Sequence, residues 1–292
     1  MNWLTLSIVS VLSLAVSNLL RKILLRDDDS DVITYSFVFQ MLCAVLVGGF
    51  AFVYGFVPPP IAQIPFNFIL TAIFYGVGTL LLFQAYKVSE VSRVTILGSS
   101  SALWVIAAAL IFLGESFSIS KVIGVALILA GVVVVTLKKE AFGFGKGDLY
   151  ALGSAMCYGL GFANDAFILR MSNALSYTPI AFLLPGLLIL ALKPKLVKNL
   201  KQFLKARVLT KMSAFAVFYS VSAVAVYLAY QNGGDAAQLG PISQLSVILT
   251  IVLATIFLGE RKSMVKKGIA AILATIGVIL LRQLQSSILF KV

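Results

Sequence analysis

Charged residues in this chain are confined to short segments, and long apolar runs separate those segments. Of the 292 residues, 60% are hydrophobic and only 12% are charged, whereas a soluble domain carries about 25% charged residues. A helix needs about 17–25 apolar residues to cross a bilayer, and backbone polar groups in lipid must be satisfied within the helix. The pattern therefore predicts an all-α integral membrane protein.

Ten apolar runs are long enough to be candidate spans. They cover residues 3–25, 32–57, 66–87, 92–113, 117–137, 147–169, 176–192, 208–231, 235–258 and 264–285. The first run lacks a preceding basic segment and a small-residue cleavage site, so we interpret it as a retained helix. Residues 193–211 form the longest hydrophilic segment, and their mixture of leucines and lysines predicts a short amphipathic helix on the membrane surface.

The chain also carries an internal duplication. Phe74-Tyr75 and Ala85-Tyr86 recur 144 residues later, and the string Ile-Phe-Leu-Gly-Glu at 111–115 recurs at 256–260. Self-similarity of this kind predicts two repeats, which we place at residues 1–142 and 143–292. Five spans per repeat is an odd number, so the second copy would lie upside down. Secondary transporters use this inverted plan, with the substrate site near the midplane between the repeats.

The basic residues are distributed unevenly between the two predicted sides. Of 23 Lys and Arg residues, 19 follow spans 1, 3, 5, 7 or 9, and only four lie on the other side. The positive-inside rule places the larger group in the cytoplasm, so both termini are predicted outside. The membrane is expected to be the plasma membrane. Because the basic residues flank apolar spans, the net charge of +12 is assigned to orientation rather than to nucleic acid.

Composition also excludes several kinds of chemistry. The chain has no histidine, which removes His-based metal sites and Ser-His-Asp triads. No Walker motif is present, so ATP drive within this chain is not expected. Cys43 and Cys157 fall inside apolar runs and are interpreted as packing residues. We expect no cofactor and no metal.

The duplicated unit resembles the EamA repeat of the drug/metabolite transporter superfamily. The likeness consists of Ala-Tyr, a short polar link, an apolar span ending in Leu-Gly-Glu, and a further span with glycines, Gly124 and Gly131 in one half and Gly268 and Gly277 in the other. It covers nearly the whole chain. The resemblance implies a ten-helix carrier with two inverted five-helix repeats around a central cavity, transporting amino acids, other small metabolites or drugs, often by export.

Ionisable and amide groups within predicted spans are the first candidates for function, because burying them in a bilayer is costly. Asp165 is a candidate proton-coupling or substrate-amine site. An ion pair with Arg170, Arg21 or Lys22 would explain it equally well. Its neighbour Asn164 and the near-equivalent Asn18 are candidate cavity-facing amides, although an interhelical hydrogen bond is the alternative.

Tyrosines and small polar residues supply further candidates for the cavity lining. Tyr75 and Tyr86 lie about three helical turns apart and share a face, as do Tyr219 and Tyr230. Cavity lining, structural hydrogen bonding and an interfacial belt remain open for them. Early in spans 4 and 9, and on span 3, the candidates for pocket lining are Ser100, Trp104, Gln244 and Gln84. Packing is the alternative for Trp104.

Two glutamates are interpreted as structural. Glu115 and Glu260 each end an apolar span shortly before the next one begins. A carboxylate in that position can accept hydrogen bonds from the backbone N–H groups at the start of the next helix. We therefore expect both to cap helices rather than to act in transport.

The residues and the resemblance together indicate a secondary carrier for small neutral or zwitterionic metabolites, such as amino acids, working by alternating access. Its expected partners are a small-molecule substrate and the lipid bilayer, with no nucleic acid, and a homodimer is left open. The alternatives are an integral-membrane enzyme of lipid metabolism and a non-transporting membrane scaffold. The absence of histidine and the scarcity of paired carboxylates speak against the enzyme. A carrier requires a polar lining shared by the two repeats, and a scaffold does not.

Overall fold

The structure is a computed structural model that describes residues 2–26, 31–89, 94, 97–115, 118–136, 145–203, 206–257 and 264–282. Within these ranges all regular secondary structure is helical. The helices are α1 (Trp3–Arg26), α2 (Val32–Tyr54), α3 (Pro65–Val88), α5 (Ser101–Ala108) continuing as the π-helical turn η1 (Ala109–Leu113), α6 (Ile119–Thr136), α7 (Lys146–Leu169), α8 (Ala174–Leu192), the 3-10 helix η2 (Pro194–Asn199), α9 (Leu200–Phe203), α10 (Ala206–Gln231), α11 (Ala236–Ser243), α12 (Leu245–Phe257) and α13 (Met264–Arg282).

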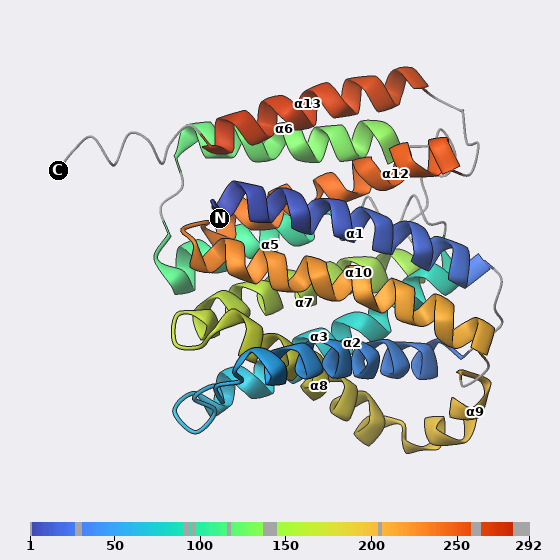
Figure 1. Ribbon diagram of the computed structural model, residues 1–292. Helices are drawn as coiled ribbons and strands as arrows, with labels where there is room; N and C mark the ends of the chain where they lie inside the picture. Colours follow the sequence, from blue (N-terminus) through green and yellow to red (C-terminus); the bar gives the residue numbers. More distant parts are fainter. Residues whose placement is uncertain are drawn as a thin grey trace.

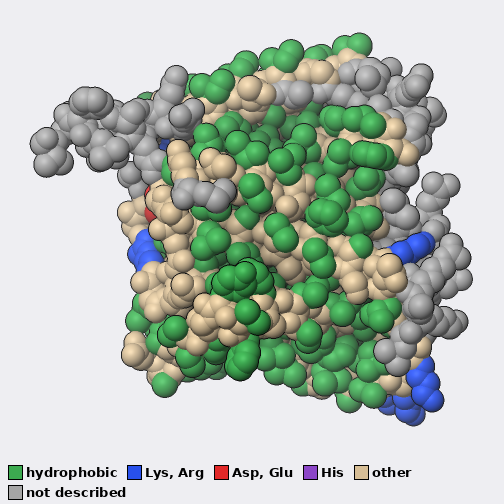
Figure 2. Space-filling model, in the orientation of Figure 1, with side chains coloured by type: hydrophobic (Ala, Val, Ile, Leu, Met, Phe, Trp, Pro, Cys, Tyr) green, Lys and Arg blue, Asp and Glu red, His purple; other side chains and the backbone are tan. Residues whose placement is uncertain are grey.

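Several of these helices are suited to a bilayer. Six stretches are long and apolar enough to cross it: Trp3–Arg21, Val32–Tyr54, Pro65–Val88, Ala174–Leu192, Val208–Gln231 and Ala236–Leu253. Three shorter apolar helical stretches accompany them. Helix α7 has the length but carries the Asn164-Asp165 pair, which lowers its hydropathy. Figure 2 shows hydrophobic side chains over the middle of the visible surface and Lys and Arg near its left and right edges. The protein is therefore a multi-pass membrane protein.

The long helices lie roughly parallel to one another in a bundle (Figure 1). The closest pairings are α1 with α10, α3 with α7, α2 with α8 and α6 with α13. Each pairing joins a helix from the first half of the chain to one from the second. In the predicted repeats, α7 corresponds to α1 and α10 corresponds to α3. The pairing of α1 with α10 therefore corresponds to the pairing of α7 with α3. The bundle is thus built from contacts between halves rather than from two separate clusters.

Local chemistry explains where several helices begin. Asp31 caps α2: its side chain accepts from the backbone N–H groups of Ile33 and Thr34. Helix α3 begins at Pro65, where a missing N–H costs nothing. The side chain of Asn173 accepts from the N–H of Leu175 at the start of α8. These caps satisfy N–H groups that have no partner within the helix.

Glycines bring α6 and α13 into close contact. A Cβ placed on Gly124 would lie 2.8 Å from the carbonyl oxygen of Gly277, and one on Gly277 would lie 2.6 Å from the carbonyl oxygen of Gly124. No side chain larger than hydrogen fits at that separation without a backbone shift. Small residues at such crossings let membrane helices pack through their backbones.

Two segments differ from the sequence prediction. Residues 235–258, predicted as one span, contain one stretch long enough to cross a bilayer (Ala236–Leu253), but they form two helices, α11 and α12, that meet at Gln244, one turn after Pro241. Proline removes a backbone donor and favours a break there. Instead of one amphipathic helix, the 193–211 segment begins as the 3-10 helix η2 and the four-residue α9, and α10 already starts at Ala206. Leu196 and Phe203 are nevertheless buried, and the lysines at 193, 195, 198 and 201 are exposed.

Candidate functional site

A cavity of about 190 Å³ lies at the centre of the bundle. Helices α1, α2, α3, α5, α7, α8, α10 and α11 contribute to its wall, so both halves of the chain line it. Seven of its lining side chains are aromatic: Phe39, Tyr75, Tyr158, Phe162, Phe182, Tyr219 and Tyr227. The polar remainder consists of hydroxyl and amide side chains: Ser10, Gln40, Ser101, Ser222, Ser243 and Gln244.

Asp165 lies behind this wall, four residues before the end of α7, and its side chain is fully buried. The hydroxyl of Tyr177 donates to Oδ1 at 2.5 Å, and the hydroxyls of Tyr75 and Tyr227 both donate to Oδ2. The three tyrosines come from α8, α3 and α10. Tyr75 and Tyr227 also line the cavity, so the carboxyl group is joined to the cavity through their hydroxyls.

This carboxyl group ends a longer chain of hydrogen bonds. The amide of Asn164 bonds the side chain of Asn67, with Asn67 Nδ2 donating to Asn164 Oδ1 at 2.7 Å. Asn164 Nδ2 donates to Thr71 Oγ1 at 3.0 Å, and the Thr71 and Tyr177 hydroxyls are 3.0 Å apart. Helices α3, α7 and α8 are thereby fixed to one another by polar contacts that surround Asp165.

A second, shorter chain reaches the cavity from α2. Gln40 Nε2 donates to Thr79 Oγ1 at 3.2 Å, and Thr79 Oγ1 lies 2.9 Å from the hydroxyl of Tyr158. Gln40 is 3% exposed, and its Oε1 has no hydrogen-bond partner. A buried acceptor without a partner is costly. Gln40 and Tyr158 both line the cavity, and this acceptor is buried within its wall.

The predicted site residues are found in three different settings. Tyr75, Tyr219 and Gln244 line the cavity. Asp165 and Asn164 belong to the network behind it. The remaining candidates do not line this cavity: Asn18, Gln84, Ser100, Trp104 and Tyr230.

Two of these candidates lie close to the cavity without lining it. Ser100 donates to the carbonyl oxygen of Leu97, while its neighbour Ser101 takes the lining position and accepts from Gln244 Nε2. Trp104 is 39% exposed and is not among the lining residues. Because α5 turns by about 100° per residue, a shift of one position moves a side chain to a different face.

Arginines and tyrosines pair in the same way in each half of the chain. Arg21 donates to Asn18 at 2.9 Å and to the Tyr86 hydroxyl at 3.4 Å, and Arg170 donates to the Tyr230 hydroxyl at 3.0 Å. Tyr86 and Tyr230 are repeat equivalents. The two arginines that could have paired with Asp165 are thus bound elsewhere, and the side chain of Lys22 lies outside the described residues.

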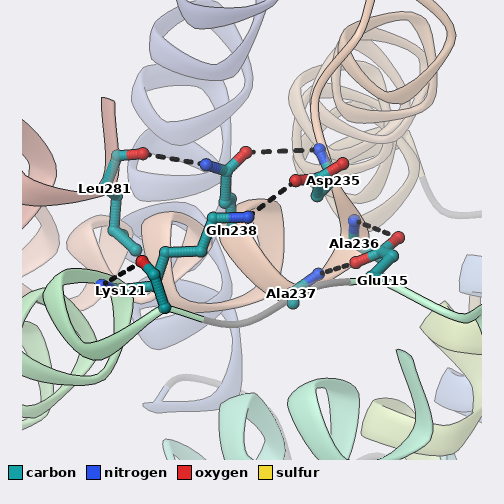
Figure 3. A network of polar contacts seen from close by, with 8 residues as sticks. Glu115, Lys121, Asp235, Ala236, Ala237, Gln238 and Leu281 are labelled. Atoms are coloured by element: carbon teal, nitrogen blue, oxygen red, sulfur yellow. Dashed lines mark hydrogen bonds and ion pairs between the residues drawn. The ribbon is translucent and has the colours of Figure 1, made fainter. Parts of the chain in front are cut away.

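A polar network ties the two halves together at one end of the bundle (Figure 3). The carboxylate of Glu115 accepts from the backbone N–H groups of Ala236 and Ala237, each at 2.9 Å. Lys121, whose side chain is 8% exposed, pairs with Asp235 at 2.9 Å. Burial raises the pKa of Glu115 above its ordinary value, and the two N–H donors oppose that rise.

The capping role expected for Glu115 takes a different form. Glu115 caps α11, in the other half of the chain, by accepting from the N–H groups of Ala236 and Ala237. It directly follows Gly114, whose left-handed conformation (φ 66°) ends η1. Glu260 lies outside the described residues.

Sequence reasoning missed the residues that complete the site. Tyr177 and Tyr227 supply two of the three donors to Asp165, and Gln40 and Tyr158 also line the cavity. Tyrosine prefers the membrane interface, so its presence within apolar spans was an available signal. Which tyrosines face Asp165 depends on helix packing. Among the described residues, no group of three His, Cys, Asp or Glu side chains is placed to hold a metal ion.

Comparisons with known proteins agree with this architecture. A profile of the EamA-like transporter family matches residues 1–137 and again residues 145–283. A solved crystal structure of a protein superimposes with a TM-score of 0.75 over 97% of each chain at 15% identity, which shows the fold alone. No curated protein sequence matches this chain. The two family matches span almost the entire sequence, and the chain therefore belongs to the EamA-like transporter family, whose members are membrane transporters of the drug/metabolite transporter superfamily.

Proposed function

We propose that this protein is a secondary carrier that moves small neutral or zwitterionic metabolites, such as amino acids, by alternating access around the central cavity. The observation that carries the proposal is the cavity itself, because its wall of aromatic, hydroxyl and amide groups is drawn from both halves of the chain. A scaffold has no use for a polar lining shared in this way. The cavity volume of about 190 Å³ suits a small solute.

The proposed arrangement in the membrane is ten crossings in two inverted five-helix repeats, with both termini outside and the basic segments in the cytoplasm. In support, α1 begins and α13 ends on the same side of the bundle in Figure 1. The Arg-Tyr pairs of the two halves lie near opposite ends of it. The plasma membrane and the export direction are proposed from the family resemblance. A terminal cysteine labelled by an impermeant reagent in intact cells supports this orientation, and a protected cysteine opposes it.

Asp165 is the proposed coupling group. It is fully buried and connected to the cavity through two tyrosine hydroxyls. A carboxyl group held in this way can gain or lose a proton without leaving its partners, because a phenol can donate or accept. Movement of α3 or α10 would change the hydroxyls that contact it, which links its proton to the state of the carrier.

Counterflow in proteoliposomes tests the transport function. Purified protein is reconstituted with a panel of unlabelled amino acids inside, and uptake of the labelled compound is followed. Saturable exchange of a panel member is the expected result. If no panel member exchanges although the protein is folded, the carrier proposal fails, and the enzyme and scaffold alternatives gain support.

The coupling role has its own test. Asp165→Asn should retain exchange at saturating solute but lose accumulation driven by a pH gradient, because the amide cannot carry the proton. Asp148→Asn is the matched control. Asp148 lies on the same helix but accepts from the backbone N–H of Gly145 at the far end, so this variant should keep the pH response. Full pH-driven accumulation by Asp165→Asn would contradict the coupling role.

A further inference from the structure

We propose that the cavity recognises its solute by a positively charged amino group, which is held at the hydroxyl oxygens of Tyr75 and Tyr227 and by the surrounding aromatic rings. This inference rests on the proposed carrier function, because it specifies which part of the solute the same cavity selects. It predicts that the amino group of a zwitterion is required for binding and that its carboxylate is dispensable.

The direction of the hydrogen bonds at Asp165 determines what Tyr75 and Tyr227 can offer a solute. The hydroxyl protons of Tyr75 and Tyr227 are both committed to Asp165. A phenol that has used its only proton can offer a neighbour nothing but lone pairs. The two tyrosines therefore present acceptors to the cavity that they line, and bonding to a carboxylate makes each oxygen a stronger acceptor. Their natural partner is a group rich in N–H donors.

Charge supports the same conclusion. Asp165 is fully buried, and its partners among the described residues are hydroxyl groups rather than cations. The described lining of the cavity contains no Lys or Arg, and Arg21 and Arg170 bond other groups. Opposite charges attract strongly where water is excluded. A cation in the cavity is thus favoured by Asp165, while the carboxylate of a solute finds no fixed positive charge in the lining.

The remaining wall fits a cation as well. Seven aromatic side chains line a space of about 190 Å³, and ammonium groups are attracted to the negative faces of aromatic rings. The rings of Tyr75 and Tyr158 stand edge to face with centroids 5.7 Å apart.

Matched ligands test the proposal without requiring transport. The probes are propylamine, butylamine and pentylamine, each compared with the alcohol and the carboxylate of the same chain length, at neutral pH. The measurement is the ligand-dependent rise in Tm of the purified protein, which reports binding to the folded state. Each amine should bind at least about tenfold more tightly than the alcohol and the carboxylate of the same chain length. Equal or tighter binding of the alcohol or carboxylate overturns the proposal, as does an absence of stabilisation by every amine.

Variants test which residues recognise the amino group. Tyr75→Phe and Tyr227→Phe, tested singly, keep the rings but remove the acceptors, and each should reduce the amine preference several-fold. Tyr86→Phe is the control, because Tyr86 contacts Arg21 and does not line the cavity, and it should keep the preference. An unchanged preference in both folded test variants would contradict the proposed acceptors.

The two proposals can fail separately. Amine binding without counterflow of any solute would sink the carrier function and leave the recognition site standing. Counterflow of an amino acid that the matched carboxylate inhibits as well as the amine does would sink the recognition proposal and leave the carrier standing.

Discussion

Asp165 shows how one buried carboxyl group is made tolerable in a bundle of apolar helices. An isolated charge in such surroundings is costly. Three tyrosine hydroxyls offset that cost, since hydrogen bonds to charged groups contribute about 1.5–3 kcal/mol each. Each hydroxyl comes from a different helix. The same contacts that stabilise the carboxylate therefore also fix the relative positions of α3, α8 and α10.

At the start of α2, another carboxylate gives a pH-dependent prediction. Burial acts to raise the pKa of Asp31, but hydrogen bonds from the Thr34 hydroxyl and from the N–H groups of Thr34 and Ile33 outweigh it and lower the pKa below 3.8. A lowered pKa means that the cap stabilises the protein above pH 3.8 and that this contribution is lost as the pH falls through the folded-state pKa.

Asp31→Ala should therefore destabilise the protein by about 0.5–2 kcal/mol at neutral pH, and the difference should shrink in acid. Thermal unfolding in detergent across a pH series measures it. Asn173→Ala removes the cap of α8, which does not titrate, so its effect should be independent of pH. A cost for Asp31→Ala that stays constant below pH 3.8 would show that the charge of the cap is irrelevant.

Among the elements, α6 and α13 pack closely against each other through glycine. Gly277→Ala would place a methyl group 2.6 Å from a backbone oxygen of α6, so the helices must separate. Overpacking of this kind costs about 1–3 kcal/mol, and we expect a lower Tm.

Gly268 provides the matched control for this helix contact. It lies on the same helix, and a Cβ there would meet no atom within 4 Å. Gly268→Ala should leave the Tm unchanged or raise it slightly, because alanine favours a helix more than glycine does. Equal destabilisation by both substitutions would mean that the close approach of Gly124 and Gly277 is not what matters.

The network in Figure 3 connects α6 to the start of α11 across the two halves. Because the ammonium of Lys121 is nearly buried, it interacts more strongly with Asp235 than an exposed pair would. A double-mutant cycle of Lys121→Met and Asp235→Asn should give a coupling energy above about 0.5 kcal/mol. Effects on unfolding free energy that add within that margin would show that the pair contributes nothing specific.

For the molecule as a whole, the sequence was sufficient to predict an all-helical membrane protein of the EamA-like family, because apolar run length and duplication are readable along the chain. It also singled out Asp165, Tyr75 and Gln244, since polar groups in apolar runs are conspicuous. It could not identify Tyr177 or Tyr227 as partners of Asp165, because that requires knowing how three packed helices are oriented about their own axes. The same limit applies to Trp104, which is a candidate for the lining on sequence grounds but is not among the residues that line the cavity.

The claim that the solute passes through the central cavity is tested most directly by filling the cavity with a large side chain and measuring exchange. Ala223 is a small lining residue on α10, and Ala223→Trp would occupy much of the space. Counterflow should fall at least about tenfold, while Ala107→Trp, at an exposed position of α5, should exchange at the parental rate. Both variants must first be shown to be folded by their Tm. Loss of exchange only in Ala223→Trp is the predicted result. Parental exchange by folded Ala223→Trp would contradict the claim that the solute passes through this cavity.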